Sequence, residues 1–201
     1  MAMTEPIRNR RQVQELADFY LKQNRLRDCC LIVLGVYTAL RIGDLLRLTW
    51  DDVYDFAHRR VRTDIMLTEK KTGKTKFVAL NKRVVRALAR FASEAAQPGC
   101  PLIANARTGK AISRIQAYRI VRAAAEALRF PCRVSCHSLR KTFGYHAWKC
   151  GVSPAVIMDI YNHSSFAVTR RYLGVSQDDK NEVYLLLDFS APRGTSKTRS
   201  A

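Results

Sequence analysis

The sequence predicts a mainly α-helical fold with one small antiparallel β-sheet. Apolar residues recur at helical spacing along most of the 201 residues, whereas residues 59–80 change to the alternation of strands around a turn. The length suits one domain with a full core, and no internal repeat or low-complexity linker divides the chain. We expect one folded domain over residues 11–189, between a basic N-terminal arm at 1–10 and a disordered basic tail at 190–201.

The expected elements follow in a simple order. Helices are predicted over about 11–23 and 27–39, and a short helix lies in RIGDLLRLTWDDV at 41–53. Residues 59–80 predict a β-hairpin in which Gly73 of KKTGK supplies the turn. Helices follow at about 82–96, 113–129 and 137–150.

The C-terminal part continues this pattern. Gly151 ends one helix, and Ser153-Pro154 begins the next in the favoured N-cap and N1 order. SQDD at 176–179 resembles a capping box ahead of the apolar segment VYLLLDF. The expected core includes Trp50, Trp148, Tyr145 and Tyr161, and the expected role of His58 and His146 is structural.

Charge indicates the class of partner. The chain has 35 Lys+Arg against 17 Asp+Glu, which gives a formal net charge of +18. Such an excess favours a polyanion, with nucleic acid ahead of a membrane surface, over the alternative of a basic but merely solvated surface. No apolar run approaches the ~18 residues of a membrane span, and MAMTEPIRNRR lacks the apolar core of a signal peptide. We therefore expect no membrane partner and a cytoplasmic, nucleoid-associated location.

Six cysteines raise the question of zinc. Cys132, Cys136, His137 and Cys150 could surround a metal ion, but their spacing matches no common structural zinc site, and no CxxC pair is present. We expect reduced cysteines that pack as small hydrophobes, and no metal.

One motif points to phosphate chemistry. In CHSLRKTFGYHAW, at 136–148, His137 and Arg140 are three residues apart, so both lie on one face of the predicted helix. An imidazole and a guanidinium on one face suit a phosphate group. Four other residues complete a set that could handle a phosphodiester: Arg41, Lys71, His163 and Tyr172. Arginines neutralise non-bridging oxygens, a phenol can attack phosphorus, and lysine or histidine can move protons.

These residues and motifs carry a family resemblance. ALRIGDLLRLTWDDV, HSLRKTF and HSSFAVTRRYLGV occur in that order, with the hairpin lysines between the first two. The chain from about 12 to 185 thus resembles the catalytic domain of the tyrosine recombinases, the phage-type integrase family. The resemblance implies the catalytic-domain fold of that family and double-stranded DNA as partner.

The resemblance also implies roles. Tyr172 would be the nucleophile that forms a 3′-phosphotyrosyl link and releases a 5′-hydroxyl, with no cofactor and no ATP. Arg41 and Arg140 would clamp the phosphate, and His137 would assist proton transfer from the tyrosine. His163 would hydrogen-bond the phosphate. Lys71 would be the general acid, with Lys74 as the second choice.

Further expectations concern the surroundings of this site. Asp44 resembles an acidic residue that supports the site from behind and could orient an arginine. We expect self-assembly into a tetramer on DNA, from a monomer or weak oligomer, with the last apolar segment docking on a neighbour. The basic residues that we expect to contact DNA are Arg59, Arg60, Arg62, Lys70, Lys74, Lys76, Lys82, Arg83 and Lys141.

Two departures from the family pattern are evident. Asn162 stands where glycine is usual, and asparagine tolerates a left-handed conformation. Only about ten residues precede the first helix, so we expect either an excised catalytic domain or a short single-domain recombinase, such as those that invert promoter segments.

Three functions fit these observations. The expected one is a site-specific recombinase for integration, excision or inversion of DNA. A type IB topoisomerase is an alternative that the chain length and the HSLR motif make weaker. A catalytically silent DNA-binding regulator is the other alternative, and the complete residue set argues against it.

Overall fold

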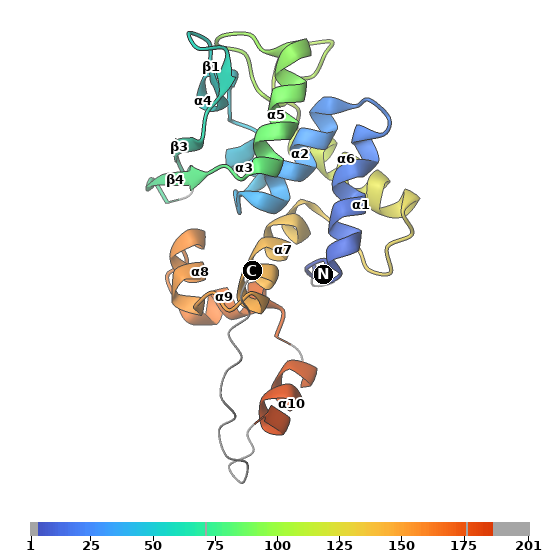
Figure 1. Ribbon diagram of the computed structural model, residues 1–201, viewed down its shortest axis with the longest axis vertical. Coiled ribbons are helices and arrows are strands. Elements are labelled where there is room, and N and C mark those ends of the chain that lie inside the picture. The colour runs from blue at the N-terminus through green and yellow to red at the C-terminus, as the bar shows by residue number, and fades with distance from the viewer. Residues whose placement is uncertain (1–3, 71, 176, 187–201) are drawn as a thin grey trace, which may run out of the picture.

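The computed structural model describes residues 4–70, 72–175 and 177–186. Ten helices and four short strands make up this part of the chain (Figure 1). The helices before the second sheet are α1 (Arg10–Leu21), α2 (Leu26–Tyr37), α3 (Ile42–Leu45) and α4 (Trp50–Val53). Those after it are α5 (Lys82–Ala95), α6 (Arg114–Ala127), α7 (Cys136–Lys149), α8 (Pro154–Tyr161), α9 (Phe166–Leu173) and α10 (Gln177–Leu186). The predicted fold class and the order of the long helices are confirmed.

Helix α2 forms the centre of the main core. Ten of its twelve residues are buried, which explains why its sequence is apolar nearly all round. Helices α1, α5 and α7 pack against it, as Figure 1 shows for α1 and α5. Trp50 and Tyr20 are among the largest fully buried side chains, and the Tyr20 hydroxyl donates to the Ile120 carbonyl at 2.8 Å. Trp50, Tyr145 and Tyr161 are buried as predicted, whereas Trp148 is only partly buried.

The strands form two separate sheets rather than one. Strand β1 (Tyr54–Asp55) pairs with β2 (Arg60–Val61), and β3 (Asp64–Thr68) pairs with β4 (Thr75–Ala79), both antiparallel. The prediction of one hairpin over 59–80 was therefore wrong at its N-terminal end, because residues 60 and 61 pair with β1, the strand that precedes them in the chain. The β3–β4 hairpin has Thr68 opposite Thr75, and Gly73 takes a φ of 67° in its turn. The predicted role of Gly73 is confirmed.

Helices α7, α8 and α9 pack against one another in the C-terminal part of the chain. Ser153 caps α8 through the backbone N–H of Ala155, and Pro154 is its first residue, as predicted. Asn162 ends α8 with φ 51° and ψ 45°, so asparagine does supply the left-handed turn. A small second core holds α8 and α9 together through Ala39, Ile157, Tyr161 and Leu173.

The two ends of the described chain differ in their packing. Residues 4–9, which fall in the predicted N-terminal arm, lie against α7: Ile7 is buried, its N–H donates to the Thr142 hydroxyl at 2.9 Å, and its carbonyl lies 2.9 Å from His146 Nε2. Helix α10 lies away from the other helices in Figure 1, and Lys149 contacts its Asp179 at 2.5 Å. The predicted capping residue Ser176 and the tail at 190–201 lie outside the described residues.

Two further observations concern the cysteines and the helices. All six cysteines are free; Cys29 and Cys30 lie in the main core, where burial raises the pKa of the Cys29 thiol to about 11. In the described ranges no three histidine, cysteine or carboxylate side chains gather as metal ligands would. None of the helices in the same ranges has the length and apolarity needed to cross a bilayer.

Candidate active site

A cleft of about 460 Å³ lies between the N-terminal end of α7 and the turn that joins α2 to α3. Four of the predicted catalytic side chains line it together: Arg41, His137, Arg140 and Tyr172. They come from positions up to 131 residues apart, so the fold and not the local sequence brings them together. The remaining lining residues are Ile42, Gly43, Asp44, Lys70, Arg114 and Cys136.

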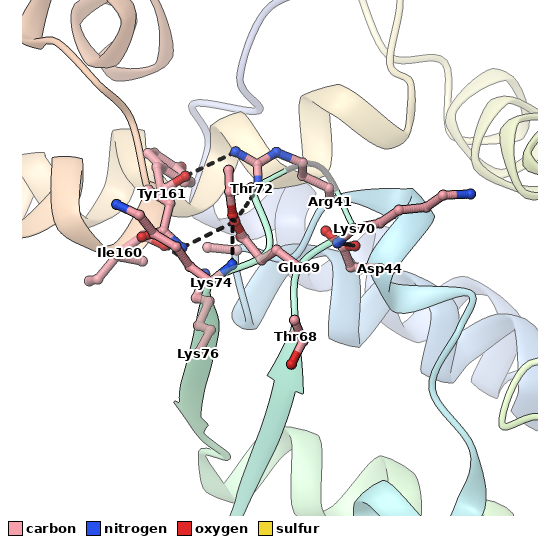
Figure 2. Close-up of polar contacts among 12 residues, drawn as sticks. Arg41, Asp44, Thr68, Glu69, Lys70, Thr72, Lys74, Lys76, Ile160 and Tyr161 are labelled. Atoms are coloured by element: carbon pink, nitrogen blue, oxygen red, sulfur yellow. Dashed lines mark hydrogen bonds and ion pairs between the residues drawn. The ribbon is translucent and has the colours of Figure 1, made fainter.

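The α2–α3 turn orients Arg41 and provides a backbone carbonyl that accepts a hydrogen bond from Arg140. Ala39 is buried with a φ of 55°, a left-handed conformation that is uncommon for alanine. Such strained positions persist only where their surroundings fix them, and here the Ala39 carbonyl accepts a hydrogen bond from Arg140 Nη1. Two residues later, Arg41 places Nη2 3.2 Å from the Tyr161 carbonyl and Nη1 2.6 Å from Glu69 (Figure 2).

Arg140 is held almost completely out of solvent. It is 2% exposed, and its Nη2 donates to the Tyr161 carbonyl at 3.0 Å. Its guanidinium also lies over the Tyr161 ring, 4.5 Å from the centroid. Burial and the neighbouring charge of Arg41 lower the pKa of Arg140, yet a guanidinium stays protonated in proteins. One backbone carbonyl, that of Tyr161, therefore fixes both arginines beside the cleft.

The start of α7 adds a second electropositive element. Ser135 caps this helix by accepting from the N–H groups of His137 and Ser138. A helix N-terminus carries partial positive charge and favours an anion next to it. Burial, followed by the charges of Lys141 and Arg140, lowers the pKa of His137, so its imidazole is neutral at pH 7 and can accept a proton.

Tyr172 lies among three aromatic rings. The centroids of His163, Tyr161 and His137 are 4.6, 4.9 and 5.0 Å from that of Tyr172. The cationic groups of Arg140 and Lys141 lie 5.9 and 5.8 Å from the same ring. Positive charge next to a phenol stabilises the phenolate that a nucleophilic tyrosine must become.

His163 packs behind Tyr172 and does not line the cleft. Its Nδ1 lies 3.0 Å from the hydroxyl of buried Thr169, which orients the ring. Burial, then the charges of Arg140 and Arg41, lowers the pKa of His163 to about 4. The imidazole is therefore neutral at pH 7, and it can donate a hydrogen bond from its other nitrogen without carrying charge.

The β3–β4 hairpin reaches the cleft from the opposite side. Asp44 is buried, and its Oδ1 accepts from the backbone N–H of Lys70 at 3.0 Å, while the Lys70 side chain lines the cleft and points away from Glu69 (Figure 2). The carboxylate that pairs with Arg41 is Glu69, whereas the arginine nearest Asp44 is Arg47, whose Nη1 lies 3.9 Å from Asp44 Oδ1. Lys71, the predicted general acid, lies outside the described residues.

The residues expected to contact DNA are placed in different environments. Arg59, Arg60, Arg62, Lys70, Lys74 and Lys82 are exposed. Arg83 instead pairs with Asp18 at 3.0 Å, and Lys141 is buried with Nζ 2.6 Å from the Thr4 carbonyl. Lys76 turns inward and donates to the Ile160 carbonyl at 2.6 Å; burial and the charge of Arg140 lower its pKa to about 8. These last three side chains are already engaged within the fold.

Three groups in the site were not predicted. Alternation along β3 places Ile65, Leu67 and Glu69 on one face, and this signal was available in the sequence. Arg114, at the start of α6, lines the cleft next to Gly43, where a Cβ would collide with its guanidinium. The third is the Tyr161 carbonyl, a backbone group that no side-chain pattern reveals.

The arrangement suits an attack on phosphorus. Two fixed guanidiniums and a helix N-terminus can stabilise the charge of a pentacovalent phosphate, and a phenol lies beside two neutral imidazoles. Comparison with known proteins then shows the family. Residues 9–178 match the model of the phage integrase family. The chain belongs to this family.

Relatives of this phage integrase chain include bacterial recombinases. It is 35% identical over 184 residues to the probable integrase/recombinase YoeC of Bacillus subtilis, which covers 92% of this chain and 97% of that protein. It is 30% identical over 150 residues to the type 1 fimbriae regulatory protein FimE of Escherichia coli, with 73% of each chain covered. With the tyrosine recombinase XerC of Pelobacter propionicus the identity is 29%, and this chain spans about half of that relative (51%).

Solved structures confirm the fold of this integrase-family chain. The crystal structure of XerA recombinase matches with a TM-score of 0.74 over 96% of this chain and 68% of the other, at 21% identity. XerH site-specific recombinase, bound to a palindromic difH substrate in a post-cleavage complex, matches with a TM-score of 0.72 at 18% identity, over 88% and 51% of the two chains. The predicted tyrosine recombinase catalytic-domain fold is therefore confirmed.

Proposed function

We propose that the chain is a site-specific DNA recombinase that cleaves and rejoins double-stranded DNA through a 3′-phosphotyrosine at Tyr172. The convergence of Arg41, His137, Arg140 and Tyr172 on one cleft carries this proposal. In the cleavage step the Tyr172 oxygen bonds to phosphorus, the bond to the 5′-oxygen breaks, and the phenolic proton passes to a base such as His137. The two arginines stabilise the non-bridging oxygens, and the neutral His163, which contacts the Tyr172 ring, donates a hydrogen bond to one of them once the phosphate is joined to Tyr172.

The energy of the broken bond stays in the phosphotyrosyl link, so rejoining by a 5′-hydroxyl requires no ATP. The arginines supply the positive charge that a metal ion supplies in other phosphoryl-transfer enzymes, and we propose that no cofactor takes part. Lys71 donates the proton to the leaving 5′-oxygen. The substrate is DNA of the cytoplasmic nucleoid, on which we propose that four protomers assemble.

A direct test begins with the unknown site. Duplexes bound by the protein are selected from a random-sequence library, and a nick is placed near each scissile position to trap the covalent adduct. An adduct that maps to Tyr172, together with sequenced junctions between two DNA sites, supports the recombinase and distinguishes integration, excision and inversion. Supercoil relaxation without joined sites would instead support a topoisomerase, and binding without an adduct would support a silent regulator.

Affinity for the selected duplex is expected to fall steeply with salt, because phosphate contacts release counterions. Six of the side chains expected to contact DNA are exposed cations: Arg59, Arg60, Arg62, Lys70, Lys74 and Lys82. If each neutralises one phosphate, a plot of log Kd against log salt concentration has a slope of about 5 in magnitude. Lys74→Gln should lower this slope by about 1, whereas Arg83→Gln, whose cation is paired with Asp18, should leave it unchanged. A nearly flat plot for the wild-type protein would contradict an electrostatic DNA face.

Assembly on DNA is expected to depend on α10. Val183, Tyr184, Leu185 and Leu186 are 53–84% exposed, which is a large apolar surface for one helix end. Deletion of residues 181–201 should weaken pairing of two DNA sites more than binding to one site, measured by gel mobility shift. The double variant Leu185→Gln/Leu186→Gln removes only exposed apolar surface. It should also weaken the pairing of two DNA sites more than the binding to one site. Unchanged pairing in both variants would refute a docking role for α10.

A further inference from the structure

Glu69 follows β3 with its side chain fully buried (0% exposed), directly behind the cleft. Its Oε2 lies 2.6 Å from Arg41 Nη1 and accepts hydrogen bonds from the Thr72 hydroxyl at 2.8 Å and from Asn162 Nδ2 at 3.1 Å. Figure 2 shows Glu69 between Arg41 and Thr72. We refer to Glu69, Arg41, Thr72 and Asn162 as the Glu69 cluster. Its members come from the α2–α3 turn, the hairpin and the end of α8.

The carboxylate of Glu69 is held in its charged form. Burial alone raises the pKa of a carboxyl group, but the hydrogen bond from Thr72, the ion pair with Arg41 and the hydrogen bond from Asn162 more than offset it, so the pKa of Glu69 lies below its ordinary value. A charge without partners at this depth is strongly unfavourable, so the loss of one partner disturbs the others. The cluster therefore behaves as a unit.

Arg41 is oriented at two points. Glu69 holds Nη1, and the Tyr161 carbonyl holds Nη2 at 3.2 Å, so the plane of the guanidinium is fixed while it lines the cleft. A carboxylate paired with an arginine in this way selects one rotamer of a long, flexible side chain. Without Glu69, Arg41 keeps its charge but loses one of the two contacts that aim it.

Asn162 contributes to the cluster in two ways. Its left-handed backbone ends α8 directly before His163, a task that glycine performs equally well. Its side chain adds the bond to Glu69, which glycine cannot supply. Lys76 makes a second link between the same segments, because its Nζ donates to the Ile160 carbonyl at 2.6 Å. The hairpin is therefore joined twice to the chain segment that leads to His163 and Tyr172.

We propose that Glu69 is a positioning residue for strand cleavage: it aims Arg41 at the scissile phosphate and, through Asn162, joins the β3–β4 hairpin to the segment that carries His163 and Tyr172. This inference rests on the proposed function. The inference gives the Asn162 side chain a specific role: its hydrogen bond to Glu69 completes the Glu69 cluster, and glycine at this position could not form that bond.

The first test is Glu69→Gln, which keeps the shape of the side chain and removes its charge. Single-turnover adduct formation on the nicked, selected duplex is expected to fall about 10²-fold, as for a misplaced catalytic group. Affinity for the intact duplex should hold or increase, because a negative charge near the phosphate site is removed. The matched control is Asp64→Asn on the same strand, an exposed residue with the same change of charge, which should cleave at the wild-type rate.

A second test uses Asn162→Gly, which retains the left-handed backbone and removes only the side-chain bond to Glu69. Cleavage is expected to fall roughly tenfold, as for a lost hydrogen bond to a charged group. In the Glu69→Gln background the same change should cost less than that, because residues that act together are not additive. A duplex with sulfur in place of the bridging 5′-oxygen should not rescue Glu69→Gln, because a lost orientation of Arg41 is not a lost proton donor.

The outcomes separate this inference from the proposed function. Failure of the wild-type protein to form an adduct would overturn both. A wild-type adduct with both variants at the wild-type rate would overturn the inference alone, and so would rescue by sulfur or a loss of DNA affinity equal to the loss of cleavage. If Glu69→Gln does not fold, Asn162→Gly decides the question by the same measures.

Discussion

Replacement of Tyr172 by phenylalanine is expected to abolish covalent linkage to DNA while it leaves DNA binding intact. The variant loses one oxygen atom, which is the atom that bonds to phosphorus, and keeps the ring that packs against His137, His163 and Tyr161. The measurement is a denaturant-resistant protein–DNA adduct on the nicked duplex, with gel mobility shift for binding. The loss should be complete within detection.

The control for this variant is Tyr184→Phe. Tyr184 is 77% exposed on α10, close in sequence to Tyr172, and it is more exposed than Tyr172, which is only partly buried. This variant should form the adduct at the wild-type rate. A persistent adduct in Tyr172→Phe would show that another residue is the nucleophile, and its loss in the double variant would point to Tyr184.

Replacement of Lys71 by alanine is expected to slow cleavage of ordinary DNA by about 10²–10⁴-fold, as for a lost proton donor. The residues on either side of position 71 are held next to the site, since the Lys70 backbone N–H donates to Asp44 and the Thr72 hydroxyl donates to Glu69. Cleavage should recover on a duplex whose bridging 5′-oxygen is sulfur, because a thiolate departs without protonation. Arg41→Ala and Arg140→Ala should not recover, because their charge acts on the non-bridging oxygens.

Two other lysines give the controls for this experiment. Lys74→Ala removes an exposed cation across the turn, and Lys76→Ala removes the inward one whose pKa is about 8, a value that suits a proton donor at neutral pH. Whichever variant shows slow cleavage with sulfur rescue identifies the general acid. His163 is a poor substitute, because a pKa of about 4 leaves it without a proton to give as an acid.

The elements that periodicity governs could be predicted from the sequence. The long helices differ from prediction by a few residues at most, as α5 (Lys82–Ala95) against 82–96 shows. The turn at Gly73 and the left-handed Asn162 followed from the backbone preferences of those residue types. The order of the sequence motifs pointed to the residues that now line the cleft.

What could not be predicted depends on contacts between distant segments. Charge alone grouped Lys76, Arg83 and Lys141 with exposed lysines and arginines, although Lys76 and Lys141 donate to the Ile160 and Thr4 carbonyls and Arg83 forms a partly exposed ion pair with Asp18. The start of the hairpin was misplaced because residues 60 and 61 pair with β1, and a two-residue strand leaves almost no periodic signal. Glu69 could have been found by alternation, because it falls on the same face of β3 as Ile65 and Leu67.

The carbonyl of Tyr161, which holds both Arg41 and Arg140, has a consequence for how the protein can vary. Every amino acid carries that carbonyl, so substitution at 161 cannot remove it, and a mutational scan would attribute any defect there to the lost ring. Sequence differences among natural proteins likewise do not reveal the role of this carbonyl. The feature can be altered only by chemistry on the chain itself, such as an ester in place of the 161–162 amide, or by shifting the point at which α8 ends. The orientation of Arg41 and Arg140 therefore does not depend on which amino acid occupies position 161. Insertions or deletions in the turn after α8, which move this carbonyl, would change it.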